Sequence, residues 1–149
     1  MCTSSIMPIR VIRKSEEQKI HDKTVELIAE KRFSFPDDEH PQWKTYVNEP
    51  KQIMGIRKNS ESVYPDIVVV DVKRNRVVMI GEVETENTVS KDEAEQWKEY
   101  SSVCSTFYLY VPEGYAEKAK SLLTDEGIKY SGLRVYSYNE KGEISIRNV

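Results

Sequence analysis

The chain has 149 residues, of which 38% are hydrophobic and 32% charged, and its formal net charge is −3. This composition excludes intrinsic disorder. The sequence has no apolar run of about 20 residues, which excludes a membrane-spanning helix. The negative net charge argues against strong nonspecific binding of polyanions. The chain start lacks the basic and apolar stretches of a signal peptide, and Cys2 and Cys104 have no metal-ligand spacing. We expect one cytoplasmic domain over 1–149, with 1–14 as an N-terminal extension.

The N-terminal part is predicted to form one helix followed by weakly patterned strands. Ser15 is a candidate N-cap, and apolar residues recur at helical spacing from there to about Arg32. A proline-bounded acidic stretch over 33–41 should be a solvated loop rather than a metal site. Residues 43–47 and 52–56 read as short strands, with 48–50 as a hairpin turn between them.

The central part carries the clearest strand signals. Residues 66–72 and 77–85 are two β-branched runs joined by a polar segment over 73–76. Because both runs are apolar on each face, we expect central strands that are covered on both sides.

The C-terminal part alternates helices and strands. Ser90 begins a helix that runs to about Ser102, with Glu93 three positions on as in a capping box. A strand over 106–111, a helix over 113–126 and a hairpin of 133–138 with 143–146 complete the chain. The order predicts the α/β class, with a mixed central sheet flanked by helices.

Three acidic residues are predicted to converge at one edge of this sheet. Glu82 and Glu84 point to the same face because a strand has a period of two, and Asp66 begins the preceding strand. Carboxylates brought together repel one another, and a divalent cation is the usual compensation. We therefore expect Mg²⁺ or Mn²⁺ at Asp66, Glu82 and Glu84.

The two helices that precede and follow these strands carry further candidates. His21 lies on the inward side of the first helix, either as a metal ligand or as a histidine packed on an apolar face. Glu17 is the alternative ligand one turn earlier, while Glu26 projects away. Gln96 and Tyr100 are four residues apart and should both pack towards the sheet, with or without a function.

These residues, in this order, resemble the motifs of the PD-(D/E)xK nuclease superfamily, most closely those of its RecB-like branch. Pro65-Asp66 is similar to the first motif, Glu82 to the second acidic position, and Gln96 with Tyr100 to the Gln-x-x-x-Tyr helix; Thr85 and His21 match two RecB-like preferences. The resemblance covers roughly residues 15–111. It implies a restriction-endonuclease-like αβββαβ core, followed here by a C-terminal helix and strands.

The resemblance implies a metal-dependent nuclease that hydrolyses phosphodiester bonds of DNA or RNA, with DNA favoured. Asp66, Glu82 and Glu84 would be catalytic, these three with His21 would hold Mg²⁺ or Mn²⁺, and Gln96 and Tyr100 would bind substrate. The implied partner is nucleic acid. A homodimer is an option, since many nucleases of this fold dimerise to cut two strands.

One position departs from the family pattern, because Glu84 replaces the motif lysine. That lysine orients the attacking water and stabilises negative charge at phosphorus, which a carboxylate cannot do. Some restriction enzymes of this fold have a second glutamate there and still cleave with the help of metal ions. The alternative is a catalytically inactive nuclease-fold domain that acts as a nucleic-acid or protein interaction module.

Overall fold

The computed structural model describes residues 7–149, with side chains from residue 16 onward. Three helices and eight strands follow one another along the chain. They are α1 (Met7–Arg32), β1 (Trp43–Val47), β2 (Ile56–Lys58), β3 (Glu61–Val63), β4 (Ile67–Asp71), β5 (Arg76–Val83), α2 (Lys91–Val103), β6 (Phe107–Pro112), α3 (Ala116–Asp125), β7 (Gly132–Tyr138) and β8 (Ile144–Asn148). The predicted N-terminal extension over 1–14 lies partly outside the described residues.

Six strands form one mixed sheet in the order β1-β4-β5-β6-β7-β8, and β2 pairs only with β3. The pairs β1/β4, β4/β5 and β7/β8 are antiparallel, whereas β5/β6 and β6/β7 are parallel. Parallel neighbours need a crossover connection, and α2 and α3 provide the two crossovers. The predicted α/β class and mixed sheet flanked by helices are confirmed.

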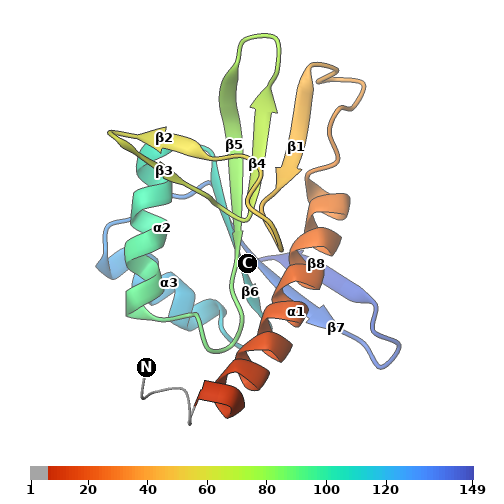
Figure 1. Cartoon of the computed structure of the whole chain (residues 1–149), viewed down its shortest axis with the longest axis vertical. Helices are drawn as coiled ribbons and strands as arrows, with labels where there is room; N and C mark the ends of the chain where they lie inside the picture. The colour runs from red at the N-terminus through yellow and green to blue at the C-terminus, as the bar shows by residue number, and fades with distance from the viewer. Residues whose placement is uncertain (1–6) are drawn as a thin grey trace.

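α1 lies on one side of the sheet and α2 and α3 lie on the other (Figure 1), and each side has its own hydrophobic core. Along β4, Val68 and Val70 pack in the core that includes α2 and α3, whereas Ile67 and Val69 pack in the core under α1. Every residue of β4 is buried, so this strand is covered on both sides as predicted. β5 becomes fully buried only over its second half.

Three local predictions are wrong: the helix start at Ser15, the hairpin turn over 48–50 and the strand over 52–56. α1 begins at Met7, so Ser15 lies inside the helix and is no N-cap. Pro8 falls in the first turn, where proline is tolerated because its missing N–H has no helical partner there, so nothing stops the helix from starting early. The hairpin through 48–50 is also absent: β1 pairs with β4, and the chain stays irregular until β2. A weak local strand pattern does not decide which strand is the partner.

The side chain of Asn48 holds the loop that replaces this hairpin. Its Nδ2 donates to the carbonyls of Met54 (2.8 Å) and Pro65 (2.7 Å), and its Oδ1 accepts from the N–H groups of Ile53 (2.8 Å) and Met54 (2.7 Å). Asn48 is only 2% exposed. A single amide thus ties the loop over 49–55 to the residue that precedes Asp66.

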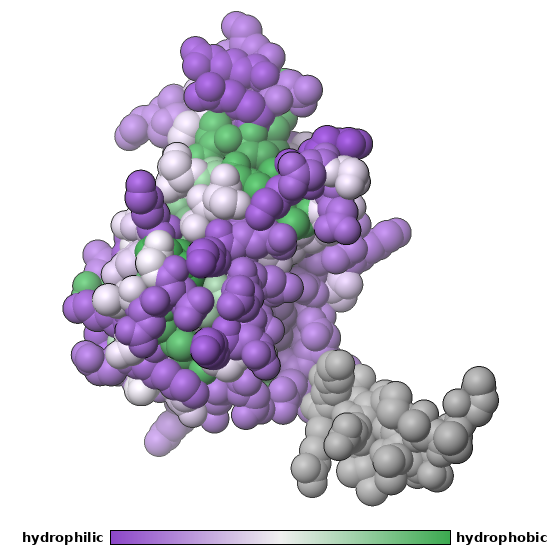
Figure 2. Space-filling view, turned by 90° about the vertical axis from the view of Figure 1, so that its left-hand side faces the viewer, coloured by the Kyte–Doolittle hydropathy of each residue, from purple (hydrophilic) through white to green (hydrophobic). Residues whose placement is uncertain are grey.

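The outer surface is mainly polar. Figure 2 shows the side of α2 and α3 as largely hydrophilic, with hydrophobic side chains gathered in its upper part. Within the described residues, no helix has both the length and the apolar character needed to cross a membrane.

We expect Asn48→Asp to lower the free energy of unfolding by about 2 to 4 kcal/mol, because it removes two donors and leaves buried carbonyls unpaired beside a carboxylate. Urea unfolding followed by circular dichroism measures this change. Asn148→Asp, at an exposed position, is the matched control and should stay within about 0.5 kcal/mol of the parent protein. Equal effects of the two substitutions would contradict the role given to Asn48.

Candidate metal centre

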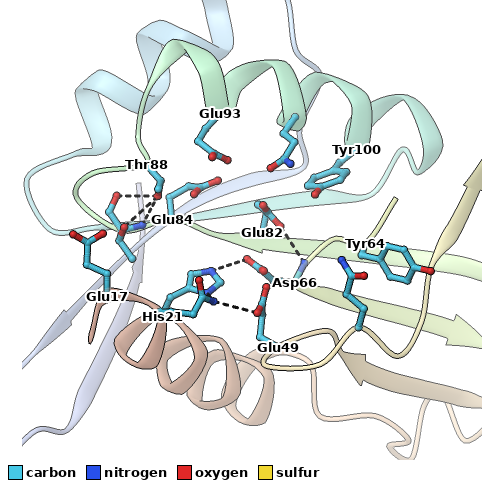
Figure 3. A pocket seen from close by; sticks show the side chains of 14 residues that line it. Glu17, His21, Glu49, Tyr64, Asp66, Glu82, Glu84, Thr88, Glu93 and Tyr100 are labelled. Carbon is cyan, nitrogen blue, oxygen red and sulfur yellow. Dashed lines mark hydrogen bonds and ion pairs between the residues drawn. The ribbon is translucent and has the colours of Figure 1, made fainter. Parts of the chain in front are cut away.

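A pocket of about 320 Å³ opens where the ends of β4 and β5 meet α1 and α2 (Figure 3). All of the predicted site residues line it. The lining residues are Glu17, Gln18, His21, Glu49, Gln52, Tyr64, Asp66, Glu82, Glu84, Thr85, Thr88, Glu93, Gln96 and Tyr100. The predicted convergence of Asp66, Glu82 and Glu84 on neighbouring strands is therefore confirmed as geometry.

Asp66 and Glu82 are connected by reciprocal hydrogen bonds. The backbone N–H of Asp66 donates to Oε1 of Glu82 (3.0 Å), while the N–H of Val83 donates to Oδ2 of Asp66 (2.9 Å). Asp66 immediately precedes β4, and Glu82 and Val83 are the last two residues of β5, so the two bonds connect the start of one strand to the end of the other. The two carboxylates consequently have fixed positions, and no N–H or O–H of the described chain donates to Oδ1 of Asp66 or Oε2 of Glu82.

Glu84 is held by a residue that the sequence analysis missed. The indole N–H of Trp97 donates to Oε2 of Glu84 at 2.6 Å, and Trp97 itself is fully buried. The hydroxyl of Tyr136 donates to the backbone carbonyl of Glu84, also at 2.6 Å. Ala94, Trp97 and Tyr100 are the buried residues of α2, and their spacing of three was the available signal.

His21 reaches the cluster from α1 and contacts Asp66. Its Nε2 lies 3.2 Å from Oδ2 of Asp66 and 3.0 Å from the carbonyl of Val83, and its Nδ1 lies 3.4 Å from Oδ1 of Asp22. Burial by itself lowers the pKa of His21, but the hydrogen bond and charge of Asp66 and the charge of Glu49 outweigh it and raise the pKa to about 10. His21 is therefore a positively charged neighbour of Asp66 at neutral pH.

Glu49 and Glu93 are two further carboxylates that the sequence did not single out as ligands. Potential ligand atoms of His21, Glu49 and Asp66 lie within 4.8 Å of one another, and so do those of Glu82, Glu84 and Glu93. Glu93 was recognised only for its place near the start of α2. Glu49 lies in an irregular loop, where neither strand nor helix periodicity indicates a direction.

The two predicted substrate-binding residues of α2 differ in their surroundings. Tyr100 is 5% exposed and lines the pocket, as predicted, and burial raises its pKa, with the negative charges of Glu82 and Asp66 adding to this effect. Gln96 also lines the pocket but is exposed, so the prediction that it packs inward is wrong. Trp97 occupies the inward position instead, which turns Gln96 to the rim.

Two glutamates of the first helix, Glu17 and Glu26, lie as predicted. Glu17 lines the pocket, although its side chain is exposed and accepts a hydrogen bond from Asn87. Glu26 is exposed and does not line the pocket.

The pocket contains far more negative than positive groups. Its six carboxylates are those of Glu17, Glu49, Asp66, Glu82, Glu84 and Glu93. His21 is the single basic residue there, and no lysine or arginine of the described chain lines it. Burial raises the pKa of Glu82 well above its ordinary value, with the charges of Asp66 and Glu84 adding to the effect. Burial likewise raises the pKa of Glu84 to about 8, against hydrogen bonds from Trp97 and Thr88 that lower it.

Comparison with known proteins gave no relative. No protein-family model matches the chain. No curated protein matches it, and neither does any solved structure. The chemistry of the pocket therefore has to be argued from the residues themselves.

We expect the metal-free protein to lose stability as the pH rises. Glu84 holds a proton in the folded state up to about pH 8, whereas the unfolded chain releases it near pH 4.5; His21 behaves in the same way between 6.5 and about 10. The folded state therefore binds more protons over this range, and each rise in pH favours unfolding. Since one pKa unit is worth about 1.4 kcal/mol, each of the two groups should account for a decrease of up to roughly 3 to 4 kcal/mol between about pH 5 and pH 9.

Urea unfolding in the presence of EDTA at several pH values measures this dependence. Glu84→Gln, which keeps the size of the side chain but cannot ionise, should make the decrease smaller. A stability that rises from about pH 5 to pH 9 would show that these groups are not protonated in the folded protein.

Proposed function

We propose that this protein is a metal-dependent nuclease of the PD-(D/E)xK type that hydrolyses phosphodiester bonds, with DNA favoured over RNA. One observation carries the proposal: Asp66, Glu82 and Glu84 gather at the ends of neighbouring strands, each at most 6% exposed and each with one oxygen held by an N–H donor. Buried carboxylates held on rigid strands suit a divalent cation, because such an ion demands fixed oxygen ligands.

The donor set of the pocket fits Mg²⁺ or Mn²⁺. Both ions prefer carboxylate oxygens, and no cysteine among the described residues lines the pocket. Burial, with repulsion from neighbouring carboxylates added to it, raises the pKa values of Glu82 and Glu84, so without an ion these groups tend to hold protons. A divalent cation can replace those protons. His21 is a further candidate ligand through its proximity to Glu49 and Asp66, and it would have to lose its proton first.

The order of the elements also supports the proposal. α1, β1, β4, β5, α2 and β6 follow one another as in the αβββαβ core that the sequence resemblance implies, with β2 and β3 inserted as a small separate hairpin. We propose a restriction-endonuclease-like core on this basis, and α3, β7 and β8 extend it.

The chain's own residues would then have distinct roles. Asp66, Glu82 and Glu84 would hold the metal, and the N–H groups of Asp66, Val83 and Trp97 would keep these ligands oriented. The bound metal would supply Lewis acidity, which activates water and neutralises charge on a phosphodiester. Gln96 and Tyr100, which both line the pocket, would contact the substrate.

A second candidate is a nuclease-fold domain without activity that binds nucleic acid or protein. Glu84 in place of the motif lysine supports it, since no lysine or arginine among the described residues lines the pocket to stabilise a negatively charged transition state. Six carboxylates would also repel a phosphodiester if no metal were bound. Activity assays separate the two candidates.

We expect cleavage of single- or double-stranded DNA that requires Mg²⁺ or Mn²⁺ and is weak on generic substrates, since the net charge of −3 limits nonspecific affinity. Asp66→Asn and Glu82→Gln should each reduce the rate by at least about 100-fold, because each removes a charged ligand. A gel assay with a labelled oligonucleotide measures the rate.

Glu86→Gln is the matched control, because Glu86 is exposed and does not line the pocket. Its rate should equal that of the parent protein. Urea unfolding of both neutral variants without metal checks that lost activity is not caused by unfolding. Glu82→Gln should keep an unfolding midpoint close to that of the parent protein, because Glu82 already holds a proton when no metal is bound. Absence of cleavage on DNA and RNA with either ion would leave the second candidate.

Glu84→Lys distinguishes the candidates by the direction of its effect. If Glu84 is a metal ligand of an active enzyme, we expect lysine to lower the rate at least tenfold, a rough bound for losing one charged ligand. Its ammonium group would take up part of the space of the ion, and its positive charge would replace part of the charge that the ion supplies. A gain of cleavage, measured with the same oligonucleotide assay, would instead indicate a domain that lost activity when the lysine was lost.

A further inference from the structure

A second pocket, of about 160 Å³, lies on the α1 face of the sheet and carries the opposite charge. It is lined by Arg32, Phe33, Met79, Tyr108, Tyr110 and Arg134. None of these residues lines the carboxylate pocket, and none is acidic. Arg32 lies eleven residues after His21 on α1, which places it roughly 16 Å further along the helix axis. We call this pocket the arginine pocket.

Arg134 is fixed over the sheet by its two neighbours. Its guanidinium carbon lies 5.2 Å from the ring centroid of Tyr108, within cation–π range. The guanidinium also lies against Gly132, where an added Cβ would collide with Nη1. A side chain at position 132 would therefore displace the guanidinium, a flexible end, without requiring the backbone to move. Gly132 thus permits the observed position of Arg134.

Both arginines keep most of their donors free. One N–H of Arg32 is used on the carbonyl of Ile146 at 3.0 Å, and Nη1 of Arg134 has a long contact of 3.4 Å with the carbonyl of Leu133. Neither arginine forms an ion pair with any residue of the described chain. Two charged guanidinium groups with unused donors facing one pocket are a typical arrangement for recognising an oxyanion.

The hydroxyl of Tyr110 adds an unpaired donor. Tyr110 is 2% exposed and lines the arginine pocket, and its hydroxyl makes no hydrogen bond with any described residue. The hydroxyl oxygen is not enclosed by the protein, so it can donate its proton to a ligand that enters the pocket. Burial raises the pKa of Tyr110 to about 12, while the charges of Arg134 and Arg32 act to lower it. The hydroxyl is therefore protonated and able to donate.

We propose that the arginine pocket is a binding site for a phosphate group. Its donors come from the end of α1, from β6 and from β7, and they all line one small pocket. A phosphate offers more acceptor oxygens and more negative charge than a carboxylate, which suits two guanidinium groups and a hydroxyl. The site is independent of the proposed nuclease activity, because it shares no residue with the carboxylate pocket.

Titration of the full-length protein with inorganic phosphate, followed by isothermal titration calorimetry in a chloride buffer, tests the proposal. We expect saturable binding of one phosphate. Arg134→Gln should weaken it about tenfold or more, and Tyr110→Phe several-fold, because each removes a donor to a charged ligand. Gly132→Ala should weaken binding by displacing Arg134 while leaving its charge in place.

Arg147→Gln is the matched control, since Arg147 is an exposed arginine paired with Glu113 and does not line the arginine pocket. Its affinity for phosphate should equal that of the parent protein. No saturable binding, or an equal loss in Arg147→Gln and Arg134→Gln, would overturn the proposal. If Arg134→Gln does not fold, Gly132→Ala and Tyr110→Phe decide, and unchanged affinity in both would also overturn it.

The phosphate could be free or could be the terminal group of a nucleotide chain. A dinucleotide with a 5′-phosphate, the same dinucleotide without it, and inorganic phosphate distinguish these sources. Tighter binding of the phosphorylated dinucleotide than of inorganic phosphate, with none by the unphosphorylated form, would identify a nucleic-acid end. Equal binding of the phosphorylated dinucleotide and of inorganic phosphate would identify free phosphate as the ligand. Binding of the unphosphorylated dinucleotide as tight as that of the phosphorylated one would contradict phosphate recognition.

Discussion

The reciprocal hydrogen bonds between Asp66 and the end of β5 are the constraint on which the carboxylate pocket depends. Oε1 of Glu82 accepts from the N–H of Asp66, and Oδ2 of Asp66 accepts from the N–H of Val83. These bonds lie where the β4/β5 pairing ends, so they fix the two acidic side chains relative to each other as firmly as the sheet fixes its strands. Asn48 adds support from the other side by bonding the carbonyl of Pro65.

Asp66, Glu82 and Glu84 lie close together, and each is less than 7% exposed. Keeping all three ionised there costs electrostatic free energy, which the fold does not remove by itself. His21 offsets part of the repulsion at Asp66, and Trp97 offsets part at Glu84. The raised pKa values of Glu82 and Glu84 reflect the part of this electrostatic cost that remains. Protons or a divalent cation can each neutralise the remaining charge, and this is the physical basis of both the pH dependence and the proposed metal chemistry.

The two pockets carry charge of opposite sign, and α1 contributes residues to both of them. On the α2 face, Glu82 and Glu84 follow the alternation that places Ile80 in the core with Trp97. Along β6, Phe107, Leu109 and Val111 point into the core under α2 and α3. Tyr108 and Tyr110 alternate with them, point to the α1 face and line the arginine pocket. A net charge of −3 therefore conceals one strongly acidic and one basic pocket. The acidic pocket suits a divalent cation and the arginine pocket suits a phosphate, and the two proposals rest on different residues.

The sequence by itself determined those features that depend on local periodicity. Strand parity placed Glu82 and Glu84 on one face, and β-branched runs located β4 and β5, because side-chain direction along a strand follows from backbone geometry alone. Only the tertiary structure decided that Trp97 bonds Glu84 and that β1 pairs with β4. Such contacts join segments distant in the chain, and their choice depends on how whole elements pack, which no local pattern records.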